Sequence, residues 1–310
     1  MSLTEDQLVA WFEAQRRLDP RRFPIGIGDD MAQIRLADQA SVLMTTDMLL
    51  EGVHFDLAVA TLDQVGYKAM ATSLSDCAAM ASRPLAAVVS VGWPLHLAAE
   101  QIKQVHAGIL RASDRYDCPV VGGDTTCWTK PAPLVISVAM LSEPAASRPV
   151  TRSGARVGDA ICVTGLLGGS QAGRHLEFEP RVEEAISIAR AVDLHAMMDL
   201  SDGLASDLPR ICRQSGVGAI IETADLPVSE AAKGSPDPVH SALCDGEDFE
   251  LLFTLSEADC AKLLKTWDRP LPLARIGIIT DTGKVQVRTP GAPIQDLKET
   301  GYDHFVHGHD

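Results

Sequence analysis

The sequence predicts an α/β or α+β protein built as two domains that join near residue 145. The chain has 310 residues, which is enough for two ordinary domains. Short apolar, β-branched runs alternate with amphipathic stretches along the whole length, so strands and helices are intermixed. After Glu143-Pro144 this alternation begins again, which indicates a second folding unit.

The first half is predicted to contain four strands and three helices. The strand that ends near residue 46 would deliver Asp47 to a loop, and a later short strand would lead likewise into Gly122-Gly123-Asp124. Thr61 caps a long Ala-rich helix that carries Asp76 in its second half. The strands are expected at 41–46, 85–92, 118–121 and 134–141, and the helices at 4–18, 61–81 and 97–115.

The second half is predicted to be mixed in the same way. A Gly-rich turn follows its first strand, and a short extended piece ends at Asp199. Asp207 is expected on a solvated face of the helix that follows. The strands are expected at 160–164, 197–199, 218–222, 249–255 and 273–279, and the helices up to about 192, at 203–214 and at 257–266.

Composition and charge exclude several classes of function. The formal net charge is −15, which argues against a nucleic-acid partner because phosphate backbones need a basic surface. No run reaches the ~18 uncharged apolar residues that a membrane helix requires. Seven cysteines without a Cys-x-x-Cys pair are typical of small buried side chains in a reducing compartment. We therefore expect a cytoplasmic protein without a membrane or nucleic-acid partner.

Six acidic clusters recur along the chain, and five share one pattern: a short apolar strand or helix end, then small residues, then aspartate. The five are Gly26-Ile27-Gly28-Asp29-Asp30, Thr45-Thr46-Asp47, Leu74-Ser75-Asp76, Gly122-Gly123-Asp124 and Asp199-Leu200-Ser201-Asp202-Gly203. The sixth is Gly246-Glu247-Asp248-Phe249-Glu250. Each cluster alone is ordinary turn or N-cap chemistry. Because ligand sites of open α/β sheets lie at the carboxyl ends of strands, the recurrence predicts that several of these carboxylates converge.

Converging carboxylates require a counter-charge, because two unit charges about 4 Å apart repel by about 4 kcal/mol at an effective dielectric constant of about 20. Shifted pKa values or bound cations would relieve this repulsion. Mg²⁺ fits best, since it prefers oxygen ligands and keeps positions for phosphate oxygens. Carboxylates, a divalent metal and phosphate together indicate phosphoryl transfer, in which positioning and charge neutralisation do most of the catalysis.

The common nucleotide-binding signatures are missing. The sequence has no G-x-x-x-x-G-K-[ST] loop, and Gly26-x-Gly28 does not continue into G-x-G-x-x-G. No protein-kinase catalytic loop is present either. A nucleotide would therefore be held mainly through its metal ions.

Seven segments, in chain order, resemble the thiamine-monophosphate kinases, a family within the aminoimidazole-ribonucleotide synthetase superfamily. They are GIGDD at 26–30, TTDMLLEGVHF at 45–55, GYKAMATSLSDCAAM at 66–80, VGGDTT at 121–126, TRSGARVGD at 151–159, MDLSDGLASDL at 198–208 and GEDFELLFT at 246–254. The resemblance implies the two-domain fold of that superfamily. An N-terminal mixed-sheet domain, residues 1–145, would bind ATP and Mg²⁺ and dimerise, and a C-terminal α/β domain, residues 146–310, would complete the cleft.

The resemblance also implies a homodimeric enzyme that binds ATP, several Mg²⁺ ions and thiamine monophosphate. The metal ligands would be Asp30, Thr45, Thr46, Asp47, Asp76, Asp124, Asp199 and Asp202. ATP would contact Gly123, Asp124, Arg148 and Ser201, and thiamine monophosphate would contact His54, Glu247 and Tyr302. The implied reaction is in-line attack of the substrate phosphate on the γ-phosphate of ATP, without a phospho-enzyme. Because a phosphate nucleophile is already ionised near neutral pH, no side chain is assigned as a catalytic base.

One departure from the family pattern and two alternatives bear on this interpretation. Asp245 stands where the family usually has glycine, so we expect it either to stiffen its loop or to adopt a left-handed conformation. A related synthetase with another acceptor is one alternative, although the reactive cysteines that selenophosphate synthetase and the hydrogenase-maturation enzyme would need are missing near the two ends. A non-enzymatic cation-binding protein is the other, although no EF-hand loop is present.

Overall fold

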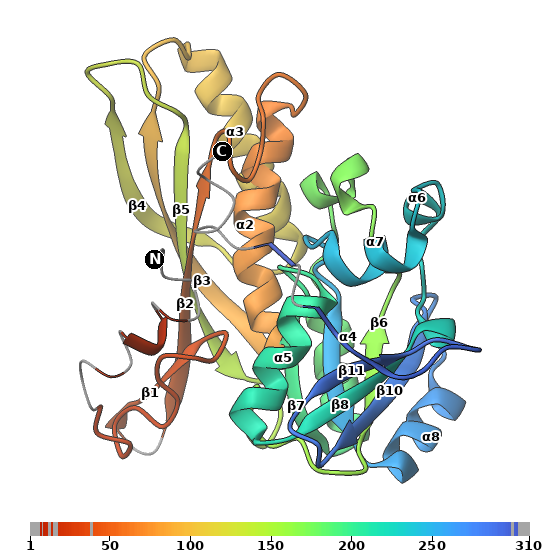
Figure 1. The fold of residues 1–310 in the computed structure, drawn as a ribbon. Helices are drawn as coiled ribbons and strands as arrows, with labels where there is room; N and C mark the ends of the chain where they lie inside the picture. The colour runs from red at the N-terminus through yellow and green to blue at the C-terminus, as the bar shows by residue number, and fades with distance from the viewer. Residues whose placement is uncertain are drawn as a thin grey trace.

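Two mixed β-sheets organise the chain, one in each half (Figure 1). The computed structural model describes residues 7, 9–11, 14, 18–37, 40–298 and 301–302. Most neighbouring strands are antiparallel, and β3–β4 and β8–β11 are parallel. This architecture confirms the predicted mixed α/β class with two sheet-containing parts.

The first sheet has five strands in the order β1-β2-β5-β3-β4. Their bounds are β1 (Ala32–Arg35), β2 (Ser41–Leu50), β3 (Ser82–Trp93), β4 (Val120–Cys127) and β5 (Val135–Pro144). The helices α2 (Leu62–Ala79) and α3 (Ala99–Arg115) cover one face of the sheet (Figure 1). The opposite face of the sheet is not covered by α2 or α3 (Figure 1).

The helix α2 begins and packs as its sequence requires. The Thr61 hydroxyl accepts a hydrogen bond from Gln64 N at 3.2 Å, and the Gln64 side chain accepts one from Thr61 N at 3.0 Å, which makes a capping box. A Cβ built on Gly66 would lie 1.9 Å from Val105 O, and one on Gly108 would lie 1.9 Å from Asp63 O. Glycine at both positions therefore lets α2 and α3 approach closely.

Two of the predicted strands end too early. β2 continues to Leu50 because it pairs with β5 throughout, and Asp47 faces Val138 inside that ladder. β4 continues to Cys127 beside β3, so Asp124 pairs with Ser90 in register. The expectation that strand ends deliver Asp47 and Asp124 to loops is therefore wrong.

The second sheet has seven strands in the order β12-β11-β8-β10-β6-β9-β7. The strands are β6 (Ala160–Thr164), β7 (Leu194–Asp199), β8 (Gly218–Glu222), β9 (Leu251–Leu255), β10 (Leu273–Thr280), β11 (Val285–Arg288) and β12 (Gln295–Asp296). The helices are α4 (Val182–Ala191), α5 (Leu204–Ser215), α6 (Glu230–Lys233), α7 (Pro238–Cys244) and α8 (Glu257–Thr266). The sequence did not predict β1, β11, β12, α6 or α7, all of which are short.

A continuous apolar core joins the two halves. Strand alternation sends Met197 into a cluster that also contains Leu74 and Met140 of the first half, whereas Met198 faces a second cluster with Leu208. The helix α2 lies between the first sheet and the second half (Figure 1). Because most of its residues are buried, α2 can hold polar side chains at fixed positions between the halves.

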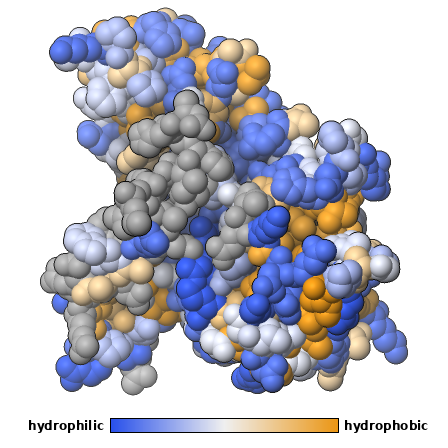
Figure 2. Space-filling model, viewed as in Figure 1, coloured by the Kyte–Doolittle hydropathy of each residue, from blue (hydrophilic) through white to orange (hydrophobic). Residues whose placement is uncertain are grey.

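Two predictions concern the chain ends and membranes. Of the predicted helix 4–18, residues 7, 9–11 and 14 are helical, and the other residues up to 17 lie outside the described part of the chain. Among the described residues, no helix is both long and apolar enough to cross a membrane. In the view of Figure 1, hydrophilic residues are visible along part of the boundary between the two halves (Figure 2).

Candidate active site

A cleft of about 440 Å³ lies between the two halves. Its walls include predicted site residues from both parts of the sequence. From the first half come Asp30, Asp47, His54 and Asp76, and from the second half come Asp199, Ser201, Asp202, Glu247 and Tyr302. The structure thus brings most of the predicted site residues to one cavity.

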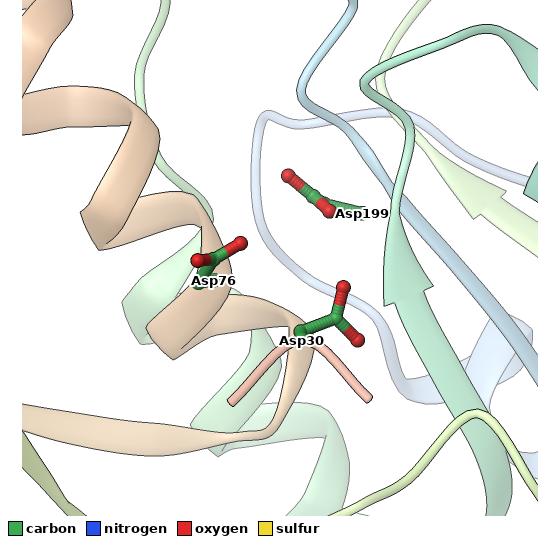
Figure 3. A group of neighbouring side chains, drawn as sticks. All are labelled: Asp30, Asp76 and Asp199. Carbon is green, nitrogen blue, oxygen red and sulfur yellow. The ribbon is translucent and has the colours of Figure 1, made fainter. Parts of the chain in front are cut away.

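Three aspartates from distant parts of the chain converge at one end of the cleft (Figure 3). Asp30 lies in the loop before β1, Asp76 in the second half of α2, and Asp199 at the end of β7. One carboxylate oxygen from each lies within 4.8 Å of the others. Only oxygen donors make up this group, which is the ligand type that Mg²⁺ prefers.

Hydroxyl groups fix the orientation of the carboxylates. Ser73 Oγ donates to Asp47 Oδ2 at 2.5 Å, and Ser75 Oγ donates to Asp199 Oδ2 at 2.5 Å. Both serines belong to α2, so this helix positions side chains from β2 and β7 as well as its own aspartate. The Thr45 hydroxyl donates to Asp76 Oδ2, because strand alternation puts Thr45 and Asp47 on the face of β2 that looks toward α2.

Burial and mutual repulsion raise the pKa values of these carboxyl groups. The pKa of Asp76 lies well above its ordinary value, first because of burial and then because of the charges on Asp47, Asp199 and Asp30. Burial and then the charge on Asp30 raise the pKa of Asp199 to about 7. Burial also raises the pKa of Asp47, against the hydrogen bond from Ser73. The cluster is thus poised to take up protons or cations.

Arg152 supplies a positive charge at the edge of the cluster. Its Nη2 donates to Asp30 Oδ1 at 2.7 Å and its Nε donates to Asp30 Oδ2 at 3.2 Å. The backbone N–H of Arg152 donates to Asp29 Oδ1 at 2.7 Å. The Gly28–Asp30 loop is therefore attached to the second half, and Asp29 has a structural partner of its own.

Asp202 and Asp207 share Arg210 beside the cluster. Arg210 Nη1 donates to Asp202 Oδ2 at 2.5 Å and to Asp207 Oδ1 at 2.8 Å. Asp207 Oδ2 also accepts a hydrogen bond from Asp202 N at 3.1 Å. Asp207 is fully buried, so the expectation that it lies on a solvated helix face is wrong. The reason is its role in closing the turn that leads from β7 into α5.

The other end of the cleft is built around a buried lysine. Lys68 Nζ donates to Glu247 Oε1 at 2.6 Å and to the His54 backbone carbonyl at 2.7 Å. Glu247 Oε2 accepts a hydrogen bond from Gln171 Nε2 at 2.9 Å. Leu50 N donates to His54 Nδ1 at 3.0 Å, which orients the imidazole ring. Tyr302 lines this cleft and is more exposed.

The sequence suggested an unusual backbone conformation at Asp245, but the positive φ angles of this loop lie at the residues that follow it. Asp245 has φ −64° and ψ −31°, which is ordinary right-handed geometry at the end of α7. The positive φ angles fall on Gly246 (70°), Glu247 (52°) and Phe249 (50°). Asp245 therefore does not adopt the left-handed conformation that we considered for it. Its carboxylate instead accepts hydrogen bonds from Gly169 N at 2.8 Å and from Ser241.

The structure does not bring five predicted residues into the lining of the cleft. One of them, Thr45, still donates to Asp76, which lines it. Gly123 and Asp124 lie on the exposed edge strand β4. Thr46 points to the exposed face of β2, opposite to Asp47. Arg148 is exposed near the start of β7, where Nη2 donates to Leu194 O at 3.2 Å. Because Asp199 ends the same strand, Arg148 is separated from it by roughly 16 Å.

Sequence reasoning missed the basic side chains of the site. Lys68 and Arg152 both lie in the segments that resemble the kinase family, yet neither had an assigned role. Two signals were available: a lysine inside an otherwise Ala-rich helix, and the need of an aspartate cluster for a counter-charge. Gln171, an ordinary surface residue type, gave no signal.

Comparison with known proteins places this fold and site in a family. The family model described as AIR synthase related protein, N-terminal domain, matches residues 28–143, and the corresponding C-terminal domain model matches residues 152–289. The class defined by the fold and the carboxylate-lined cleft is therefore that of the AIR synthase related proteins.

Individual relatives narrow the class further. The thiamine-monophosphate kinase of Rhodopirellula baltica is 37% identical, over 98% of this chain and 97% of its own length. That of Escherichia coli strain K12 is 31% identical over 99% of both chains. A solved structure of AaThiL complexed with AMPPCP and TMP matches with a TM-score of 0.83 and 30% identity, over 98% of this chain and 99% of that one. The chain belongs to the thiamine-monophosphate kinase family, which favours the kinase over the synthetase and cation-binding alternatives.

Proposed function

We propose that the protein transfers the γ-phosphoryl group of ATP to the phosphate of thiamine monophosphate and so forms thiamine diphosphate. The observation that carries this proposal is the cleft between the halves, with buried carboxylates at one end and the Lys68–Glu247 pair at the other. The family relatives support the choice of substrates, since one was solved as a complex with AMPPCP and TMP.

The carboxylate end of the cleft fits Mg²⁺. Asp30, Asp47, Asp76 and Asp199 would hold the ions, and bound Mg²⁺ neutralises phosphate charge. Ser73, Ser75 and Thr45 keep three of these carboxylates in place, so little reorganisation is needed when phosphates arrive. Asp202 remains a candidate ligand beside this group, and Thr46 and Asp124 remain candidates that this chain does not bring to it.

The phosphates of ATP would meet Ser201 and an arginine. We assign the arginine contact to Arg152, because its guanidinium lines the cleft and already binds a carboxylate of the metal group. Arg148 and Gly123 are weaker candidates, since neither lines the cleft. On the acceptor side, His54, Glu247 and Tyr302 would contact thiamine monophosphate.

The transfer would be direct. The acceptor phosphate is ionised near neutral pH, so the chain needs only to align it with ATP and to shield both from water. ATP with a stereochemically labelled γ-phosphate tests this step. Inversion at phosphorus is expected, whereas retention would require a phospho-enzyme.

The overall reaction is tested by incubating the protein with ATP, Mg²⁺ and thiamine monophosphate and separating the products by chromatography. Thiamine diphosphate is expected, and free thiamine serves as the control acceptor. Phosphorylation of another acceptor with no thiamine diphosphate would contradict the proposal.

We also propose that residues 1–145 and 146–310 act as two domains of a homodimer whose first sheets pair. The support is an apolar face opposite α2 and α3, where Met44, Leu141 and Val88 are exposed on neighbouring strands. The edge strand β4, with Asp124, is exposed on both faces and would adjoin the second copy. Val88→Glu should yield a monomer by light scattering, whereas Val59→Glu, at an exposed loop position, should not.

A cytoplasmic location is part of the same proposal. All seven cysteines lie in the described part of the chain and are free thiols, as is typical of a reducing compartment.

A further inference from the structure

Lys68 is a buried charge in the wall of the cleft, and the transfer at the carboxylate cluster gives it no direct role. Its side chain is 1% exposed, and its ammonium group reaches across the boundary between the halves to Glu247. The partner lies 179 positions further along the chain. A lysine–carboxylate pair thus joins α2 to the loop before β9 at the wall of the cleft.

Fold stability does not account for this pair. Burying an ammonium group is unfavourable, and an apolar residue of similar volume often stabilises such a site as well or better. Glu247 also has a φ of 52°, which disfavours a residue with a side chain. Its backbone is held there by a hydrogen bond from Glu247 N to Ser201 O at 2.6 Å. Unfavourable burial and unfavourable backbone geometry coincide at the wall of a ligand cleft, which points to a role in ligand recognition.

The position of Lys68 on α2 sets its distance from the carboxylate cluster. Lys68, Thr72 and Asp76 all line the cleft and are spaced by four residues, so they lie on one face of the helix. Eight residues of α-helix span about 12 Å. The Lys68–Glu247 pair therefore stands well beyond the metal group, where the non-phosphate part of an acceptor would lie.

The surroundings of the pair suit an organic cation rather than a phosphate. Glu247 receives hydrogen bonds from Lys68 and Gln171, one on each carboxylate oxygen, which fixes its plane and leaves each oxygen able to accept a further bond. Phe249 lines the same wall and stacks on Phe178, with ring centroids 3.9 Å apart. A fixed carboxylate supplies a counter-charge, and an aromatic ring supplies a stacking surface, for a flat, positively charged ring.

We infer that Lys68 is a positioning residue. Together with Gln171, it holds Glu247 in the orientation in which Glu247 binds the positively charged ring of the acceptor. This inference rests on the proposed function, because the acceptor with that ring is thiamine monophosphate. Lys68 acts through Glu247 and takes no part in the transfer at the carboxylate cluster.

The test compares the KM values for the two substrates in Lys68→Met. The variant keeps the length of the side chain and removes its charge. We expect the KM for thiamine monophosphate to rise at least about tenfold, the effect of about 1.4 kcal/mol of lost binding, while the KM for ATP stays within about twofold. Lys103→Met is the matched control, because it removes an exposed lysine–glutamate pair on α3. Equal changes in both KM values, or none, would overturn the inference.

A double-mutant cycle with Glu247→Gln separates positioning from mere structure. If Lys68 acts through Glu247, Lys68→Met should add less than about twofold to the KM for thiamine monophosphate in the Glu247→Gln background. If the two substitutions instead multiply their separate increases in the KM for thiamine monophosphate, Lys68 acts on the substrate independently of Glu247, and the inference is overturned. Wild-type turnover distinguishes the two proposals. If the wild-type protein forms no thiamine diphosphate, the proposed function is wrong. If the wild-type protein turns over normally and Lys68→Met has unchanged kinetics, only this inference is wrong.

Discussion

Arg152 and Asp30 form a two-point ion pair between the two halves of the protein, with nitrogen–oxygen distances of 2.7 and 3.2 Å. Within the three-aspartate group, the side-chain hydrogen bonds of Arg152 go to Asp30, and its charge also opposes the rise in the pKa of Asp199. Asp76 and Asp199 are left with hydroxyl donors, which do not neutralise their charge. The metal-free cluster therefore keeps an excess of negative charge that added cations should relieve.

Mg²⁺ should stabilise the protein in the absence of nucleotide. At about 100 times the dissociation constant, a ligand that binds only the folded state adds about 2.7 kcal/mol, which for a chain of 310 residues raises Tm by roughly 4 °C. Differential scanning fluorimetry across a Mg²⁺ titration measures the shift. Asp76→Asn should lose most of it, whereas Asp296→Asn, at an exposed aspartate paired with Lys284, should retain it. An equal shift in both variants would show that Mg²⁺ acts elsewhere.

The stability of the metal-free protein should fall as the pH rises from about 4 to about 7. The folded-state pKa values of Asp47, Asp76 and Asp199 all lie above the ordinary value of 3.8, and that of Asp199 is about 7. Between these limits the folded state binds more protons than the unfolded state, so deprotonation removes stability. Urea denaturation at several pH values, with a chelator present, measures this trend.

Bound Mg²⁺ should oppose the loss of stability between about pH 4 and about pH 7. Metal ligands must be deprotonated, so the affinity for Mg²⁺ should increase over the same pH range. The stabilisation by Mg²⁺ is then largest at about pH 7 and smallest at about pH 4. A metal effect that does not vary with pH would place the ion away from these three carboxylates.

Asp47→Asn should abolish most activity and leave the fold intact. Removing one preorganised charge from a phosphoryl-transfer site is expected to lower kcat/KM by at least about 100-fold. The free energy of unfolding should stay the same or increase, because burial and the charge on Asp30 disfavour the ionised form of Asp47. The amide oxygen of asparagine can still accept the hydrogen bond from Ser73. Kinetics and thermal unfolding measure the two effects, and an unfolded variant would show that Asp47 is structural.

The sequence predicted the helices and the convergence of aspartates better than the way in which the aspartates reach the site. Periodicity and the Thr61 cap located α2 and Asp76 because both signals are local. The lengths of β2 and β4 depend on pairing with β5 and β3, which lie far away in the sequence. Asp47 therefore reaches the cluster from inside a strand, and Asp76 from inside a helix, while Asp199 alone of these three ends a strand as expected.

Partners across the boundary between the halves could not be predicted. Asp207 is a different case, because its partners Arg210 and Asp202 N lie in the same half and within five residues of it, and its burial depends on how α5 packs. Lys68 and Arg152 bind carboxylates more than 120 positions away in the sequence. Local sequence pattern indicates which residue types are unusual, whereas the identity of their partners requires the packing of α2 between the two halves.

Removing the charge of Glu247 should lower the free energy of unfolding more than removing the charge of Lys68. Glu247→Gln leaves the Lys68 ammonium, 1% exposed, with a backbone carbonyl and no carboxylate, and breaking a buried pair in this way costs about 3 to 5 kcal/mol. Lys68→Met leaves Glu247, which is 19% exposed and still bonded to Gln171, so the loss should be about 1 kcal/mol or less.

Urea unfolding of both variants at two pH values provides the measurement. Burial already lowers the pKa of Lys68, and removal of Glu247 takes away the charge that opposes this shift. The folded Glu247→Gln variant then binds fewer protons than its unfolded state, so its stability should recover as the pH rises toward the ordinary lysine pKa of 10.5. Lys68→Met has no such group and should show no recovery relative to wild type. Equal losses in the two variants, with the same pH dependence, would mean that the lysine is not held as a buried cation and that the pair does not fix Glu247.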